Sequence, residues 1–147
     1  MDIDSIFQRK WLPLGATFLV AICAVGVLAE SASAAEFRLT LTGEQEVPPV
    51  KTPGNGAGVI VIGEDGSISG NVKTNGIAGT AAHIHVGAAG ANGPIAIALA
   101  KDGDLYLVPF GLKLTEAQFA RYRTGELYVN VHTAANPGGE MRAQLYP

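Results

Sequence analysis

The sequence is poor in cysteine and has no cluster of positive charge. Its one cysteine, Cys23, lies in an apolar stretch near the N-terminus, so disulfides, cysteine metal ligands and thiol chemistry are excluded from the rest of the chain. The 10 lysine and arginine residues are scattered, and the net charge is −3. This pattern offers no electrostatic footprint for nucleic acid, and we expect no nucleic-acid partner.

What the chain does have is glycine and proline, with 19 and 8 residues. Together with abundant alanine and valine they favour strands and turns over a helical bundle. A length of 147 residues is that of one domain. We therefore expect a single core that holds together without disulfides.

The N-terminal 35 residues have the composition of an export segment. Arg9 and Lys10 precede an uncharged apolar run at residues 11–29, and small residues follow at 31–35. Cleavage of this signal peptide is expected after Ala34 or Ala35. The run is also nearly long enough to span a bilayer, so an uncleaved anchor is the alternative and the only membrane contact expected. Both alternatives export the domain at residues 36–147, to the periplasm, the cell surface or the medium.

From residue 36 onward, apolar and polar residues alternate with period two, which predicts half-buried strands. Two turns contain an Asp-Gly pair, at residues 64–66 and 101–104, as tight hairpins do. Regular short strands separated by such turns predict an all-β sandwich or barrel. About eight strands are expected, at residues 37–41, 58–62, 67–73, 81–86, 95–99, 105–110, 127–133 and 140–146.

One segment breaks this rhythm and predicts a short helix. Thr115 and Gln118 have the spacing of a capping box, and Gly125 is a stop signal. The aromatic residues of this helix are expected to cover an end of the sandwich rather than to form a ligand site. The glycine-rich segments 53–58 and 87–93 precede no helix, so we interpret both as ordinary loops.

The chain has three histidines, and all of them fall in predicted strands. Alternation places His83 and His85 on one face of their strand, opposite the apolar residues between and after them. In the strand at 127–133, His132 shares a face with Tyr128 and Asn130. If the apolar faces are buried, all three imidazoles project outward.

Three imidazoles converging from neighbouring strands would suit zinc or copper and leave one coordination position open. The alternative is structural: the rings would hydrogen-bond to backbone and to Asn130 and fasten loops at the sandwich end. Convergence of the ring nitrogens would favour the metal, whereas splayed or carbonyl-capped rings would favour the structural role.

Several other polar residues lie beside distinctive turns. Glu44 and Glu46 are expected to point the same way, and Glu140 shares a face with Arg142. Paired carboxylates for glycoside cleavage need a cleft for which this small domain hardly has room. We interpret these residues, with Asn130, as structural, through a salt bridge or hydrogen bonds to a neighbouring loop.

Five motifs in order carry a family resemblance, and they span most of residues 36–146. They are Gly43-Glu44-Gln45-Glu46-Val47-Pro48-Pro49, Ala81-Ala82-His83-Ile84-His85, Asn92-Gly93-Pro94, Tyr128-Val129-Asn130-Val131-His132-Thr133 and Pro137-Gly138-Gly139-Glu140-Met141-Arg142. Together they resemble the CHRD (chordin-type) domain family, in its single-domain microbial form. The resemblance implies an extracellular, immunoglobulin-like β-sandwich, and it implies no known reaction.

Two classes of function follow from these observations. The first is an exported, noncatalytic binding module for a protein, a glycan or a metal ion. The second is a small mononuclear copper or zinc enzyme built on the same three histidines. The first is favoured, because no other acid, base or nucleophile is both distinctive and free of a simpler structural role.

Overall fold

The computed structural model describes residues 33–147. The predicted export segment, residues 1–35, lies outside the described residues except for its last three positions, and so does Cys23. Within the part that is described, no helix is long and apolar enough to cross a bilayer.

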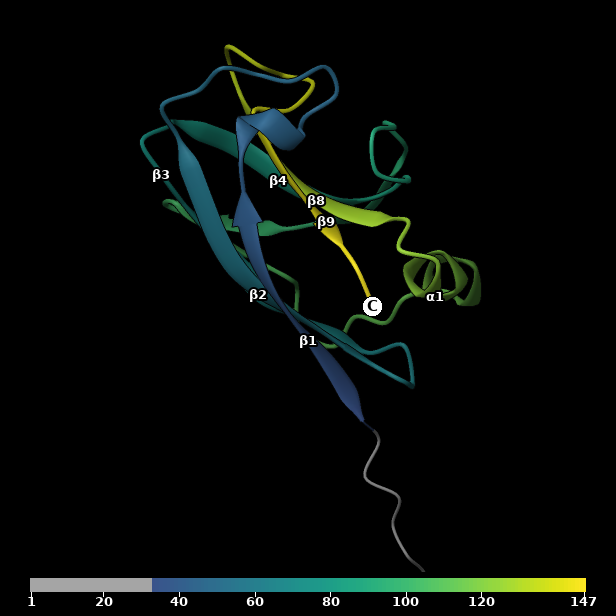
Figure 1. Cartoon of the computed structure of the whole chain (residues 1–147). Helices are drawn as coiled ribbons and strands as arrows, with labels where there is room; N and C mark the ends of the chain where they lie inside the picture. Colours follow the sequence, from purple (N-terminus) through teal and green to yellow (C-terminus); the bar gives the residue numbers. More distant parts are fainter. Residues whose placement is uncertain (1–32) are drawn as a thin grey trace, which may run out of the picture. The chain divides into compact units, whose positions relative to one another are not determined.

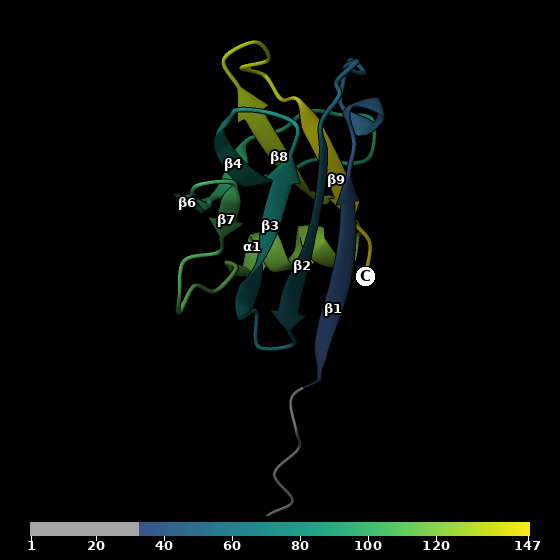
Figure 2. The same cartoon turned by 90° about the vertical axis from the view of Figure 1, so that its left-hand side faces the viewer.

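Two antiparallel sheets form the described chain and confirm the predicted all-β sandwich with one α-helix (Figures 1 and 2). The first sheet has five strands, in the order β1 (Ala34–Leu41), β2 (Asn55–Gly63), β3 (Ile68–Asn75), β7 (Leu105–Leu107) and β6 (Ala100–Asp102). The second sheet has four strands, in the order β5 (Ile95–Ala98), β4 (Gly79–Val86), β8 (Leu127–Thr133) and β9 (Met141–Leu145). The other two elements are the 3-10 helix η1 (Gly43–Gln45) and the helix α1 (Glu116–Arg123).

The core lies between the two sheets and is built by the alternation seen in the sequence. Most strands send every second side chain inward, and most of these side chains are apolar. Burying each of them contributes about 1.5–3 kcal/mol. The completely buried aliphatic members include Leu41, Ile60 and Val72 from the first sheet and Ile84, Val129, Val131 and Leu145 from the second.

Both predicted hairpins are present. The turn between β2 and β3 contains Gly66 with φ +77°, and the turn between β6 and β7 contains Gly103 with φ +59°. Glycine accepts these positive φ values without the steric penalty that other residues meet. The second hairpin adds the short strand β6, which brings the strands of the described chain to nine.

Two expectations about local structure were wrong. The segment 53–58 is only partly a loop, because β2 begins at Asn55 and runs through the glycines. A Cβ at Gly58 would overlap the carbonyl oxygen of Asn71, so the glycine allows β2 and β3 to approach closely. The strand expected at 105–110 ends at Leu107, and Pro109, two residues later, has no N–H for a ladder.

Strand β1 pairs with β2 along its whole length. Ala34 lies opposite Gly63, and Ala35 lies opposite Ile62. The predicted cleavage positions are thus part of the ladder of the five-stranded sheet.

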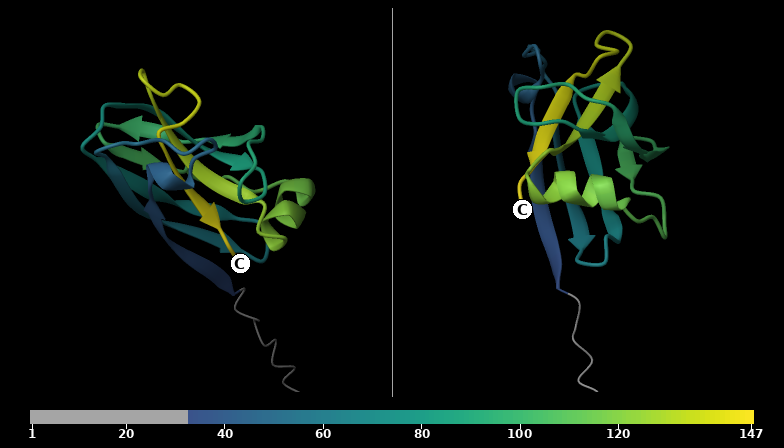
Figure 3. Two further views of the ribbon diagram at one scale, coloured as in Figure 1. Left: turned by 45° about the horizontal axis from the view of Figure 1, so that its top comes forward. Right: turned by 90° about the vertical axis from the view of Figure 1, so that its right-hand side faces the viewer.

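Helix α1 confirms the predicted capping box. The Thr115 side chain accepts from the Gln118 backbone N–H, and the Gln118 side chain accepts from the Thr115 N–H. Gly125, with φ +70°, follows the end of the helix. The helix lies across the sandwich in the right-hand view of Figure 3. Its Tyr122 packs edge-on against Phe37, with 5.7 Å between the ring centroids.

Loops gather at the end of the sandwich away from α1. The loop after β8 and the segment containing η1 lie side by side there in Figures 1 and 2. The Thr52 hydroxyl joins them by donating to the Glu140 carboxylate at 2.6 Å. Residues 87–94 begin at the opposite end, where the Gly87 N–H donates to the Glu126 carbonyl, and they reach the other two loops through the Asn92 amide, which donates to the Val47 carbonyl at 2.7 Å. These three loops surround the outer face of the four-stranded sheet.

Candidate metal centre

The three histidines lie on two adjacent strands and on one face. In the β4–β8 ladder, His83 lies opposite Asn130, His85 opposite Tyr128, and Ala81 opposite His132. Because Ile84, Val129 and Val131 fill the core, the pleat turns the imidazoles to the outer face of the sheet. That face is not open to water at every position: His85 is only 8% exposed, whereas His83 and His132 are half-buried.

The rings converge. His83 Nδ1 lies 2.9 Å from His132 Nε2, and the centroids of these rings are 4.8 Å apart. The centroid of His85 lies 5.5 Å from that of His83 and 5.9 Å from that of His132. One ring nitrogen from each histidine lies within 4.8 Å of the other two, which makes this the one such group of potential ligands among residues 33–147.

Two of the rings are oriented by backbone carbonyls. His85 Nδ1 lies 2.9 Å from the Gly93 carbonyl oxygen, and His132 Nδ1 lies 2.9 Å from that of Pro137. A carbonyl oxygen only accepts, so both Nδ1 atoms carry the hydrogen and both Nε2 atoms keep a lone pair. His85 Nε2 is buried and has no hydrogen-bond partner.

Burial lowers the pKa of all three histidines. For His83, the positive charges that His132 and His85 would carry lower the pKa further. For His85 and His132, the hydrogen bonds to carbonyls oppose the effect of burial without reversing it. The rings are therefore neutral near pH 7, and neutral imidazole is the form that binds metal ions.

Tyr128 connects this cluster to the next strand. Its ring stacks on His85 with 4.8 Å between centroids and 7° between planes. The Arg142 guanidinium, from β9, lies 3.5 Å from the Tyr128 ring centroid. The Tyr128 hydroxyl accepts from the Gly93 N–H at 3.1 Å. Tyr128 thus supports His85 both directly and through the residue that caps it.

Asn130 and Glu46 form a buried pair beside the histidines. The Asn130 amide donates to the Glu46 carboxylate at 2.6 Å, and both side chains are almost completely buried. Burial raises the Glu46 pKa to about 7, although the charge of Arg142 and hydrogen bonds from Val47 and Asn130 favour the carboxylate.

The expectation that Glu44 and Glu46 point the same way was wrong. Glu44 is exposed, whereas Glu46 is buried. The reason is that Gly43–Gln45 forms a 3-10 helix, in which side chains follow a period near three rather than the period of two of a strand.

Glu140 and Arg142 share a segment but do not form a salt bridge with each other among the pairs in residues 33–147. Glu140 accepts from Thr52, Thr133 and Asn136. Hydrogen bonding to these side chains lowers its pKa. Arg142 donates instead to two carbonyls of the 87–94 loop.

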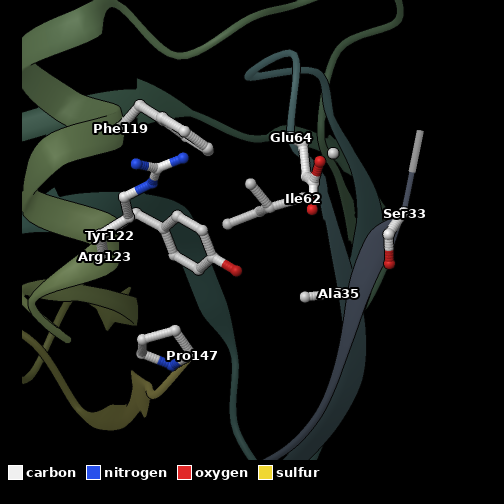
Figure 4. Close-up of a pocket in the computed structure, with 9 residues that line it drawn as sticks. Ser33, Ala35, Ile62, Glu64, Phe119, Tyr122, Arg123 and Pro147 are labelled. Atoms are coloured by element: carbon white, nitrogen blue, oxygen red, sulfur yellow. The ribbon is translucent and has the colours of Figure 1, made fainter. Parts of the chain in front are cut away.

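A pocket of about 250 Å³ lies beside α1 (Figure 4). Phe119, Tyr122 and Arg123 line it from the helix, and Ser33 and Glu64 line it from the opposite wall (Figure 4). The Arg123 guanidinium lies 4.7 Å from the Phe119 ring, and Tyr122 belongs to the hydrophobic core. No histidine lines this pocket, and its aromatic residues serve the packing of the helix.

Sequence reasoning found the histidines but missed the groups that orient them. Tyr128 carries a signal, since it alternates with His132, yet its stacking partner could not be read from period alone. The carbonyls of Gly93 and Pro137 carry no side-chain signal at all. The expectation that residues 87–93 are an ordinary loop overlooked their contact with His85 and Arg142.

The family model of the CHRD domain matches residues 37–145. No curated protein and no solved structure matches the chain.

Proposed function

This chain belongs to the CHRD family, and we propose that it is an exported, noncatalytic module that holds one zinc or copper ion through His83, His85 and His132. The observation that carries the proposal is the state of His85. Its Nδ1 is used by a carbonyl, whereas its Nε2 is buried without a partner beside two other imidazoles. An unsatisfied buried nitrogen costs about 1–3 kcal/mol, and a metal ion would remove this cost.

The spacing of the nitrogens supports the proposal. Two nitrogens bound to one tetrahedral zinc ion at about 2.0 Å are about 3.3 Å apart. His83 Nδ1 donates a hydrogen bond to His132 Nε2 at 2.9 Å, which is close to this value, and all three ligand nitrogens lie within 4.8 Å of one another. The carbonyls that hold His85 and His132 are of the kind that commonly orient metal-bound histidines from behind.

The structural alternative predicts rings that splay or that are capped by carbonyls. Two rings are capped, but at Nδ1, and His132 still turns Nε2 toward His83. The hydrogen bonds from Nδ1 to the carbonyls therefore orient the rings for convergence and leave the Nε2 atoms available.

A set of three histidines suits zinc or copper and leaves a coordination position for water or for a partner's side chain. In a binding module, a protein or glycan partner would supply the remaining contacts. A small metalloenzyme using the same histidines would be recognised by redox or hydrolytic activity of the metal-loaded protein.

Export is proposed from the sequence of residues 1–35. A basic start, an apolar run and small residues at the end are the pattern of a signal peptide or anchor. The domain would then act in the periplasm, on the cell surface or in the medium. N-terminal sequencing of the chain recovered from cell fractions tests this: a start at Ala35 or Glu36 outside the cytoplasm supports export, and a cytoplasmic chain contradicts it.

The metal is tested by elemental analysis of the chain purified without a histidine tag, beside the variant His83→Ala/His85→Ala/His132→Ala. A matched control changes Arg38 and Thr40 to alanine, since both are exposed on the outer face of the other sheet. We expect close to one equivalent of zinc or copper in the wild type and the control, and none in the histidine variant. A wild type that takes up neither metal after incubation would make the histidines structural.

A further inference from the structure

The loop after β8 is fastened by one carboxylate. Glu140 Oε1 accepts from the Thr52 hydroxyl at 2.6 Å, and Oε2 accepts from the Asn136 amide at 2.9 Å and from the Thr133 hydroxyl. Asn136 also donates its backbone N–H to Thr133 Oγ1 at 3.0 Å. The next residue, Pro137, presents its carbonyl to His132 Nδ1. Glu140 thus holds the residue that precedes the histidine's cap.

The loop before β5 is fastened by one guanidinium. Arg142 donates to the carbonyls of Ala91 and Ala88, each at 2.9 Å. The planar guanidinium can reach two carbonyls at once, which an ammonium group does less well. Two residues after Ala91, Gly93 presents its carbonyl to His85 Nδ1.

The two fastenings have the same form. Glu140 and Arg142 lie two residues apart, on either side of the first residue of β9. Each side chain holds a different loop, and each loop provides the carbonyl that caps a different histidine. The charge of each side chain suits its hydrogen-bond partners: the carboxylate accepts from hydroxyl and amide groups, and the guanidinium donates to carbonyl oxygens.

We propose that Glu140 and Arg142 are positioning residues of the metal centre, Glu140 setting the tautomer of His132 and Arg142 setting that of His85. The inference rests on the proposed metal-binding function. The mechanism is geometric. When the carbonyl is displaced, a hydrogen on Nδ1 no longer gains a hydrogen bond, so the ring populates the tautomer with hydrogen on Nε2. The Nε2 lone pair is then not available to bind a metal ion.

The test reads the tautomers directly, by ¹⁵N NMR of the imidazoles in the full chain with a chelator present. In the wild type we expect His85 and His132 to carry hydrogen on Nδ1. Glu140→Gln replaces the accepting Oε2 by a donating amide and should mix the tautomers of His132 while leaving those of His85. Arg142→Lys should have the opposite effect, on His85 alone. Zinc affinity, measured separately by competition with a chelator, should fall about 10- to 100-fold in each variant.

The matched controls are Glu36→Gln and Arg38→Lys, which make the same changes at an exposed pair on β1 and should alter neither ring. Should a buried change prevent folding, two milder variants replace it. Thr52→Val removes the hydrogen bond to Glu140 and the one from the Gly54 N–H. Gln144→Leu removes the hydrogen bond from Arg142 together with those to the carbonyls of Gly87 and Gly125. They should act on His132 and on His85, respectively.

Each outcome decides one question. A change in both rings alike, or in neither, overturns the positioning role, because general loosening has no reason to select one histidine. Ring-specific changes in a protein that binds no zinc or copper would uphold the positioning role and refute the metal function.

Discussion

The outer faces of the two sheets follow the same alternation but end in different surroundings. On β3, Ser69, Asn71 and Lys73 point outward and are exposed. On β8, Tyr128 and Asn130 also point outward, yet both are almost completely buried. The strands are alike in pattern, so the difference comes from the loops that cover the four-stranded sheet.

A polar face becomes a candidate site when loops both exclude water from it and supply hydrogen-bond partners to its side chains. A buried polar group is costly unless it is hydrogen-bonded. Here loop carbonyls satisfy His85 and His132 on one side and leave nitrogen lone pairs on the other. The exposed face of β3 meets water and needs no such arrangement.

The largest effect on stability is expected from a substitution that displaces the loop after β8 from the outer face of the four-stranded sheet. Gly139 has φ +140°, and a Cβ there would overlap the Asn130 amide and the Glu46 carboxylate. Gly139→Ala is therefore expected to lower the free energy of unfolding by about 3 kcal/mol or more. Urea denaturation measures it. Gly138→Ala is the control, since a Cβ there meets nothing within 4 Å, and it should be nearly neutral.

A second prediction compares one residue type on the two outer faces. Asn130→Ala leaves the buried Glu46 carboxyl without its amide donor and should cost about 2 kcal/mol. Asn71→Ala, on the exposed face, should stay within about 0.5 kcal/mol of the wild type. Equal costs in urea denaturation would remove the distinction between the faces.

The third prediction concerns pH. Because burial raises the Glu46 pKa from 4.5 to about 7, the folded state holds this proton more tightly than the unfolded state. The resulting stability is full below pH 4.5 and is lost as the pH rises through 7. Between pH 6 and pH 8, the wild type should lose about 1.3 kcal/mol relative to Glu46→Gln. Parallel curves for the two proteins would contradict the raised pKa.

The smallest effect on stability is expected from the three histidines in the metal-free protein. Its dependence on pH is opposite in sign to that of Glu46. Their pKa values are lowered from 6.5, so below pH 6.5 the unfolded state gains protons that the folded state resists. Stability should fall from pH 7 toward pH 5 relative to the triple histidine-to-alanine variant. Thermal melts in the presence of a chelator measure this difference, and a wild type that gains stability relative to the variant as the pH falls from 7 to 5 would contradict it.

The sequence was sufficient for features that repeat and insufficient for those that do not. Alternation placed His83, His85 and His132 on one face, because a strand ladder turns every second side chain the same way whatever surrounds it. The burial of His85 could not be predicted, since it depends on a loop whose conformation has no period. The directions of the Glu44 and Glu46 side chains could not be predicted from the period of two of a strand, because a single turn of 3-10 helix sets them.

If residues 1–35 are the proposed export segment, the pairing of Ala34 and Ala35 with β2 would put two events at the membrane in competition. A peptidase that removes the leader after either residue needs that stretch of chain unpaired, and proteolysis of a paired segment waits for local opening. Under the proposed export, a chain cut before β1 joins β2 would be released, and a chain that folds first would keep its leader. The ratio of free to tethered protein would then be governed by timing, and a change that slows the closing of the β1–β2 ladder would shift it toward release.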